Sequence, residues 1–265
     1  MIPTRGRRIV EIGAGAGRLA DLYQGYDEIF LVDYAASQLE QAHERWGDDP
    51  RFTFVQGDIY GLPFPDDYFD TVVTVRVLHH VKELPLALRE VARITAPRGT
   101  YVTEFANKRH LKAVLRYLLR RGKEGENPFS EAPFEFVPLN IDFHPRYVYG
   151  RLAEEGFVVQ AERAASFFRV PQLKRWLPPT LLATVDGWLQ KPLAPLRLTP
   201  SIFLRTYKPA SAAGSGGAEW KCPTCAGSHF MSTDERVECE RCGTIYPIIN
   251  GIHHFRSPEP TPEEA

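Results

Sequence analysis

Three alternating glycines preceded by an acid could form a ligand-binding turn near the N-terminus: Glu11, Gly13, Gly15 and Gly17. The pattern follows a short apolar run at 9–10 and opens a stretch at 19–23 with helical character. Glycines accept positive φ and carry no Cβ, so a ligand can approach such a turn closely. The spacing is not that of the dinucleotide pattern G-x-G-x-x-G, because the sixth position is Arg18. An acidic lead-in favours a cationic or amino-bearing ligand over a pyrophosphate.

Further polar residues follow three other apolar runs that have the composition of strands. Asp33 ends the run 28–32 and lies 20 residues after Gly13, the spacing at which an acid reaches a ribose diol. Asp58 and Ile59 follow the run 52–55. The run 69–75 leads into Arg76, His79 and His80. Each polar residue therefore stands at the carboxyl end of an expected strand.

Strand and helix patterns alternate from residue 8 to about 105. The expected helices are 15–24, 35–46 and 83–95, and a further strand is expected at 100–105. Such alternation predicts βαβ units, with a parallel sheet covered by helices on both faces. Ligands in these sheets bind at the carboxyl ends of the strands. The dispersed motifs are therefore expected to converge in space.

This ordered series resembles the class I S-adenosylmethionine (SAM) dependent methyltransferases, close to the broad group that includes the quinone-biosynthesis enzymes. The resemblance covers residues 8 to 105 well and 145 to 208 in outline. It implies an α/β fold with a doubly wound, mostly parallel, seven-stranded sheet whose last strand, 201–207, enters antiparallel. The family usually has a helical segment before its first strand, whereas about seven residues precede it here.

The resemblance also implies roles for the residues of the motifs. Glu11 would lie near the methionine end of SAM, beside the turn of Gly13, Gly15 and Gly17. Asp33 would take the ribose hydroxyls, Asp58 and Ile59 would hold the adenine, and Arg76 would line the far wall. A general base is needed only if the acceptor carries a proton that must be removed, and four side chains are candidates: His79, His80, His144 and Tyr147. A histidine after a buried strand is more often a packing residue.

All four cysteines lie within 21 residues, in two C-x-x-C pairs: Cys222, Cys225, Cys239 and Cys242. This spacing predicts one tetrahedral Zn²⁺ site whose four thiolates close the coordination sphere, so the metal would be structural. Gly227 and Gly243 are expected to ease the two turns. A module of about 40 residues is too small to fold on its core alone, so the metal would supply folding free energy. Two disulfides are the alternative.

The stretch 239–252 resembles the small zinc-binding activator proteins that partner tRNA, rRNA and protein methyltransferases. Those proteins usually act in trans, whereas here the module would be fused behind the enzyme. We expect the apolar run 245–249, with Ile252 and Phe255, to pack on the catalytic domain near its late strands and to stabilise it. A ribbon that swings freely and captures substrate is the alternative.

The expected organisation is a methyltransferase domain over 1–208, a flexible linker over 209–218, a zinc ribbon over 219–256 and a disordered tail over 257–265. Two insertions interrupt the first domain, at 106–145 and 170–200. The first contains a basic amphipathic helix at 108–123, and the second carries Trp176 and Trp188. Both stand where the resembling family usually builds its substrate pocket.

Composition places few limits on the partners. The net charge is −1, with 43% hydrophobic and 25% charged residues, as in an ordinary globular protein. The sequence has no secretory signal and no apolar run of transmembrane length, so we expect a cytoplasmic protein. Clustered cysteines in a reducing compartment favour metal over disulfides.

Three functions remain open for the whole chain. Methyl transfer to a small-molecule or lipid-like acceptor is favoured, with peripheral membrane contact through the basic helix as one possibility. Transfer to tRNA or rRNA would use the same helix 108–123 together with the ribbon. A non-catalytic SAM-binding scaffold is the third. The sequence identifies neither the acceptor nor the oligomeric state.

Overall fold

The computed structural model describes residues 1–122, 125–167, 178–210 and 218–256 and divides the chain into two compact units. We call the first the glycine-turn unit; it comprises 2–73, 89–99 and the described residues from 210 onward. The second, the insertion unit, comprises residue 1, 74–88 and 100–209. Each unit is described separately below.

Four parallel strands form the centre of the glycine-turn unit: β1 (Gly6–Ile12), β2 (Tyr26–Asp33), β3 (Phe52–Gln56) and β4 (Phe69–Thr74, whose last residue belongs to the insertion unit). Their order is β3-β2-β1-β4. Ile9, Val10, Leu31, Val32 and Val55 are fully buried, as expected for strands covered on both faces. The parallel sheet is confirmed, and its register places Glu11 beside Leu31 and Asp33 beside Gln56.

Two of the three helices expected before residue 105 are present, and the third is not. Helices α1 (Ala36–Trp46) and α2 (Leu84–Ile94) match the predictions closely. The expected helix 15–24 is wrong, because only a short 3-10 turn, η1 (Ala20–Tyr23), forms there. Gly15 and Gly17 both have positive φ, which a right-handed helix cannot contain. The glycine turn therefore extends to residue 19.

The insertion unit contains an antiparallel group of strands in the order β5-β9-β8. Strand β5 (Thr95–Ala106) enters from the other unit along the chain, and β9 (Ser201–Tyr207) lies between it and β8 (Val158–Ala165). The antiparallel entry of the last strand of this domain is thereby confirmed. Helices α4 (Pro145–Glu154) and α6 (Pro179–Leu189) and the short turns η2 (Leu78–His80) and η3 (Ala194–Leu196) complete this part.

The described residues of the first insertion include a helix and a hairpin. Helix α3 (Leu111–Leu118) is shorter than the expected 108–123, since Arg120 adopts positive φ after it. Strands β6 (Phe134–Val137) and β7 (Asn140–Asp142) form a two-stranded sheet. In the second insertion, Trp188 lies on α6, whereas Trp176 lies outside the described residues.

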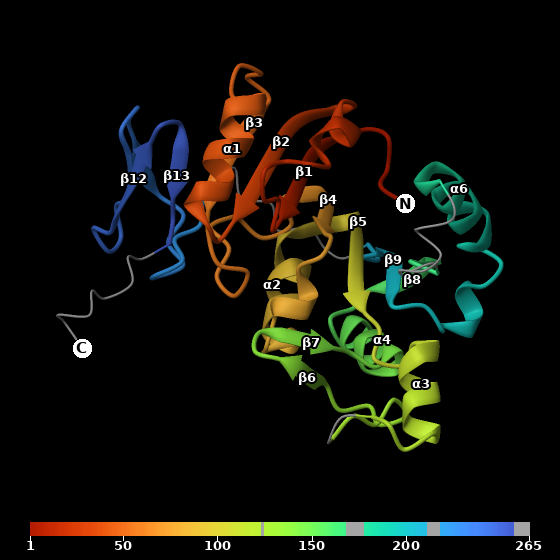
Figure 1. Ribbon diagram of the computed structural model, residues 1–265. Helices are drawn as coiled ribbons and strands as arrows, with labels where there is room; N and C mark the ends of the chain where they lie inside the picture. Colours follow the sequence, from red (N-terminus) through yellow and green to blue (C-terminus); the bar gives the residue numbers. More distant parts are fainter. Residues whose placement is uncertain (123–124, 168–177, 211–217, 257–265) are drawn as a thin grey trace. The chain divides into compact units, whose positions relative to one another are not determined.

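The cysteine module is an antiparallel meander of four strands that joins the parallel sheet (Figure 1). They are β10 (Phe230–Ser232), β11 (Arg236–Cys239), β12 (Ile245–Ile249) and β13 (Ile252–His254). Strand β13 pairs in parallel with β3, with Ile252 opposite Phe54. The glycine-turn unit thus holds eight strands in the order β10-β11-β12-β13-β3-β2-β1-β4.

The predicted count of seven strands is therefore wrong. Among the described residues the sheet counts eleven strands, the eight above with β5, β9 and β8, because the four ribbon strands extend it at β3 instead of forming a separate sheet. Most of the expected linker and the whole expected tail, 211–217 and 257–265, lie outside the described residues. Among the described residues, every helix is too short or too polar to cross a membrane.

Candidate functional site

The glycine turn has the backbone that its sequence requires. The φ angles of Gly13, Gly15 and Gly17 are 74°, 55° and 67°. The N–H of Gly13 donates to the carbonyl of Val32 at 2.7 Å, which holds the turn against the end of β2. A Cβ on Gly17 would stand 3.1 Å from the Trp46 ring, so side chains are excluded there by space as well as by φ.

Asp33 connects this turn to the start of α1. Its Oδ2 accepts a hydrogen bond from the Gly15 N–H at 2.7 Å, and its Oδ1 accepts one from the Ala35 N–H at 2.9 Å. Each carboxylate oxygen can accept a second hydrogen bond, so the group retains capacity for two hydroxyls. Asp33 is thus held in a fixed orientation at the carboxyl end of β2.

Glu11 is buried at the carboxyl end of β1, with 3% of its surface exposed. The Tyr23 hydroxyl donates to its Oε2 at 2.9 Å. Burial raises the pKa of Glu11 to about 7, against the smaller lowering effects of Tyr23 and Arg18. A carboxyl group poised in this way is stabilised in its charged form by a cation, so the position suits a positively charged ligand group.

Asp58 and Ile59 form a turn directly after β3, in the same unit as Glu11 and Asp33. The Tyr60 N–H donates to Asp58 Oδ1 at 3.0 Å, and the Gly61 N–H donates to its carbonyl at 3.1 Å. The parallel register therefore brings together all but one of the residues predicted to bind SAM: Glu11, Gly13, Gly15, Gly17, Asp33, Asp58 and Ile59.

Arg76, the remaining residue of that set, belongs to the insertion unit. It has a φ of 63° and an exposed side chain, and its N–H donates to Glu104 Oε2 at 3.1 Å. Positive φ in a residue other than glycine stores strain that surrounding contacts must maintain. Glu104, whose buried carboxylate accepts this hydrogen bond, was not among the predicted site residues, although an acid within an apolar strand is a recognisable signal.

His79 and His80 lie in the insertion unit, with ring centroids 4.0 Å apart. His80 Nδ1 is 2.7 Å from the carbonyl oxygen of Leu139, which accepts only if Nδ1 carries the proton. The neutral tautomer then leaves Nε2 with the free lone pair. His80 is exposed, and this geometry keeps it as a candidate base.

His144 and Tyr147 have structural contacts that explain their positions. His144 is the N-cap of α4, and its Nδ1 accepts from the Arg146 N–H at 3.2 Å. Burial lowers its pKa. The Tyr147 ring stacks on Phe143 with centroids 6.1 Å apart, and the Arg151 guanidinium lies 5.3 Å from its centre. Their role as bases stays a prediction, and helix capping accounts for His144 without one.

The four cysteines form a candidate metal centre. The sulfur atoms of Cys222, Cys225, Cys239 and Cys242 all lie within 4.8 Å of one another. Cys222 Sγ is 3.7 Å from Cys242 Sγ, and Cys225 Sγ is 3.6 Å from Cys239 Sγ. Zn–S bonds of about 2.3 Å in a tetrahedron require S···S separations of about 3.8 Å, so the donor set fits zinc. Disulfide bonding needs sulfurs about 2 Å apart, and all four cysteines are free.

Hydroxyl groups surround these sulfurs. Tyr246 Oη lies 3.1 Å from Cys222 Sγ, and Thr244 Oγ1 lies 3.1 Å from Cys242 Sγ. Outer contacts of this kind orient metal ligands. In the turn of the second cysteine pair, Gly243 has positive φ, as predicted. In the turn of the first pair, the residue with positive φ is Ala226 and not Gly227. Gly227 instead allows close approach, because a Cβ there would meet Arg241 Cβ at 3.1 Å.

The ribbon contacts the sheet through side chains as well as through β13. Trp220 is buried, and its ring stacks on that of Phe64 with centroids 5.8 Å apart. The ring centroid of Phe255 lies 4.7 Å from that of Trp220. His254 Nδ1 donates to the amide oxygen of Gln56 at 2.6 Å. The ribbon thus packs on β3 and the loop after it.

Two details of the predicted packing need correction. The ribbon pairs with β3, an early strand, and not with the late strands. Ile245 and Ile249 are half exposed, whereas Ile252 and Phe255 are buried. The side chains of a strand alternate between its two faces, so only part of the apolar run can point inward.

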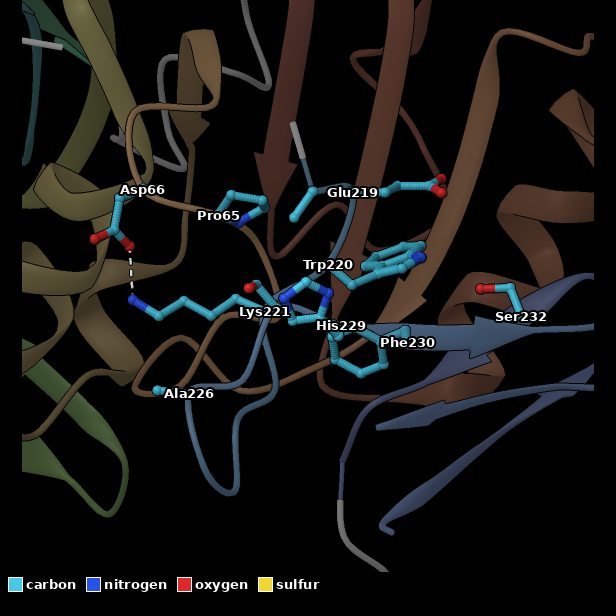
Figure 2. Close-up of a pocket in the computed structure, with 11 residues that line it drawn as sticks. Pro65, Asp66, Glu219, Trp220, Lys221, Ala226, His229, Phe230 and Ser232 are labelled. Carbon is cyan, nitrogen blue, oxygen red and sulfur yellow. Dashed lines mark hydrogen bonds and ion pairs between the residues drawn. The ribbon is translucent and has the colours of Figure 1, made fainter. Parts of the chain in front are cut away.

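A cavity of about 700 Å³ opens beside this contact (Figure 2). Lys221 on its wall pairs with Asp66 at 2.7 Å, and Asp66 also accepts from Arg93 at 2.8 Å. Trp220, His229 and Phe230 supply its aromatic lining. The cavity contains none of the residues predicted to bind SAM, and its Lys221 and Asp66 pair with each other.

Comparison with known proteins adds a family model described as "Methyltransferase domain", which matches residues 10–103. The ubiquinone/menaquinone biosynthesis C-methyltransferase UbiE of Yersinia pestis is 33% identical over 170 residues, which cover 58% of this chain and 67% of that protein. The malonyl-[acyl-carrier protein] O-methyltransferase of Halorhodospira halophila is 39% identical over 98 residues, 35% of this chain and 32% of that protein. The chain spans between 32 and 41% of the length of three such curated relatives.

Solved structures agree on the fold. A chain from the complex between the Haloferax volcanii Trm112 methyltransferase activator and a putative methyltransferase has a TM-score of 0.54 at 18% identity, covering 81% of this chain and 87% of that one. A putative SAM-dependent methyltransferase from Listeria monocytogenes also has a TM-score of 0.54, at 15% identity, covering 78% and 92%. At these identities the likeness concerns the fold alone.

Proposed function

Since the chain belongs to the class I SAM-dependent methyltransferases, we propose that it transfers a methyl group from SAM to a small-molecule or lipid-like acceptor. The observation that carries the proposal is the hydrogen bond from Gly15 to Asp33 within a turn of three positive-φ glycines. It gives the turn and the acidic residue one fixed geometry at the ends of two adjacent parallel strands.

Each residue of this arrangement has a chemical task toward SAM. The sulfonium of SAM is an activated methyl donor, so much of the catalysis can consist of positioning. Glu11 offers a carboxylate to the cationic methionine end, and Asp33 offers its remaining lone pairs to the ribose hydroxyls. Asp58 and Ile59 would hold the adenine, by a hydrogen bond and by apolar contact.

The proposed acceptor class rests on the relatives. Their names include a ubiquinone/menaquinone C-methyltransferase, a demethylmenaquinone methyltransferase and an acyl-carrier-protein O-methyltransferase. An acceptor carbon must lose a proton when it is methylated, whereas a malonyl carboxylate is already ionised at neutral pH. The free Nε2 of His80 is the group we favour for that step, and His79, His144 and Tyr147 are secondary candidates.

We further propose that the ribbon holds one structural zinc and stabilises the sheet. The four thiolates fill a tetrahedral coordination sphere and leave no position for a substrate. Strand β13 satisfies the backbone groups of the β3 edge, and Trp220 covers Phe64. An uncovered edge of this kind would otherwise invite aggregation.

RNA is the second acceptor we consider. Its support is the basic composition of 108–121 and the likeness to a complex that contains a Trm112 activator. A non-catalytic SAM-binding scaffold is the third reading. Calorimetry with SAM tests binding, and incubation with labelled SAM and extract fractions of lipid, protein and RNA tests transfer. Label in the lipid or small-molecule fraction supports the proposal. Label in RNA alone would move the assignment to RNA, and binding without transfer to any fraction would favour the scaffold.

A further inference from the structure

Helix α3 of the insertion unit turns an apolar stripe toward solvent. Leu111, Leu115, Leu118 and Leu119 expose between 49 and 64% of their surface. Their spacing of four, three and one residues places them on one face of a helix. Ala113 is buried on the other side, so the helix is anchored by a small residue and displays its large ones. Burying leucines inward would be the ordinary arrangement, so this face is one that a partner would cover.

Two aromatic residues extend the apolar surface. Tyr117 and Phe129 are both exposed, and their rings meet edge to face with centroids 5.8 Å apart. Leu196 on η3 is also exposed. The segment that follows it lies beside the start of α3, because the Leu111 N–H donates to the carbonyl of Leu198 at 2.8 Å. The apolar surface therefore includes residues from three segments.

Cations border this surface, and one of them, Arg116, is paired with an acid, Glu126. Residues 107–122 contain six Lys or Arg and no Asp or Glu. The ammonium of Lys108 is turned inward, where it donates to the Ser130 carbonyl at 3.1 Å, and Arg116 pairs with Glu126. The ion pairs among the described residues of this unit leave Lys112, Arg120 and Arg121 to solvent. Since the chain as a whole has a net charge of −1, the positive charge is concentrated locally.

We infer that α3 and its flanking residues dock the protein on an anionic lipid surface. In an interfacial helix, leucines enter the acyl region of the bilayer, and Lys and Arg beside them contact the headgroups. A hollow of about 580 Å³ lies at the end of α3, with Tyr117, Leu118 and Arg120 on its wall. Arg120 and the Tyr117 hydroxyl are groups that it offers to a phosphate headgroup, since Glu126, also on its wall, is paired with Arg116.

The same observations disfavour the other occupants. A second copy of this chain on this face would have to bury Lys112, Arg120 and Arg121 along with the leucines, and buried cations are costly without acidic partners. RNA would be attracted by the cations, but the two aromatic rings, Tyr117 and Phe129, pack edge to face on each other, and the four exposed leucines offer bases neither hydrogen bonds nor planes for stacking. The lipid surface alone uses both the charge and the leucines.

The test is co-sedimentation of the full chain with vesicles of phosphatidylcholine, with and without phosphatidylglycerol. We expect binding to the anionic vesicles that weakens in high salt, and little binding to the neutral ones. The pairs Leu115→Gln/Leu118→Gln and Arg120→Glu/Arg121→Glu should each bind at least about tenfold more weakly, because each cation and each buried leucine contributes about 1 kcal/mol or more. Leu22→Gln and Lys82→Glu, exposed residues elsewhere, are the matched controls.

Every variant is also checked for its melting temperature and SAM affinity, which should equal those of the parent. A parent that fails to bind anionic vesicles, or α3 variants that bind as well as the controls, would overturn the inference. Two other results would also overturn it. One is absence of vesicle binding together with a loss of RNA affinity in Arg120→Glu/Arg121→Glu, which would indicate RNA; the other is loss of a dimer in Leu115→Gln/Leu118→Gln, which would indicate a second copy of the chain. Because vesicle binding needs neither SAM nor an acceptor, its failure is distinguishable from failure of the proposed methyl transfer.

Discussion

The Gly15 N–H and the Asp33 carboxylate are joined at 2.7 Å, across 18 residues of sequence. The bond links the glycine turn after β1 to the end of β2, and the second oxygen of Asp33 accepts from the N–H of Ala35, directly before α1. One carboxylate therefore organises the turn and keeps lone pairs for a ligand.

Replacing Asp33 by alanine should weaken SAM binding by roughly 1.5–3 kcal/mol, the range for hydrogen bonds to a charged group. Asp58→Ala should also weaken binding. Asp21→Ala removes an exposed carboxylate from η1 and serves as the matched control. Titration calorimetry measures all three. If Asp33→Ala and Asp58→Ala both bind SAM as the parent does, the site has been misplaced.

Glu11 should give SAM affinity a pH dependence. Its pKa of about 7 means that the charged form, which favours a cationic ligand, is lost as the pH falls below 7. Affinity in the parent should therefore decrease from pH 8 to pH 6, whereas Glu11→Gln should bind more weakly and with a flatter profile. A parent profile identical to that of Glu11→Gln would argue against contact with the ligand's cation.

The same residue should reduce stability in the absence of ligand. A carboxyl group whose folded pKa exceeds its usual 4.5 stabilises the fold below pH 4.5, and this contribution is lost as the pH rises to 7. At pH 8, Glu11→Gln should thus raise the free energy of unfolding by on the order of 1–3 kcal/mol. Denaturant titration at pH 5 and pH 8 measures this difference, and equal effects at both values would contradict it.

One zinc per chain is expected, and Cys222→Ser should release it. The ribbon strands β10 to β12 should then unfold, because bound zinc supplies on the order of 10 kcal/mol to modules of this kind. The strands β1, β2 and β4 should remain folded. Elemental analysis and hydrogen exchange provide the measurements. Absence of zinc from the parent, or titration showing two disulfides, is the contrary outcome.

Trp220→Ala should destabilise the docked ribbon by about 3–5 kcal/mol, the range for truncating a buried aromatic side chain. Trp188→Ala is the matched control. Trp188 is 73% exposed, so removal of its side chain should change the melting temperature little. Truncation after Lys208 removes β13 as well and should leave β3 aggregation-prone. A truncated protein that stays soluble, with unchanged melting temperature and SAM affinity, would instead favour substrate capture by the ribbon.

Local chemistry was determined by the sequence. Positions 13, 15 and 17 need positive φ, which glycine adopts at little cost, so the turn was predictable from residue types. The two C-x-x-C pairs likewise encode two short turns whose thiolates face one centre, and the sulfur distances agree with one metal. The apolar runs that became β1 to β4 were recognisable because buried parallel strands are continuous in hydrophobicity.

Some local features were hidden by competing interactions. The expected helix at 15–24 does not form, because its own glycines, Gly15 and Gly17, adopt positive φ. His144 was selected as a possible base, yet it caps α4 through an N–H two residues later. A capping side chain and a catalytic one have the same residue type, so only the hydrogen bond distinguishes them.

The tertiary structure alone decided where the ribbon attaches. Strand β13 meets β3 across about 200 positions, and Gln56 and His254 are 198 residues apart. An apolar run such as 245–249 shows that a surface must be covered, but many strand edges could satisfy its hydrogen bonds. Pairing between distant strands depends on shape and register that exist only after both parts have folded, which is why seven strands were expected and eleven formed.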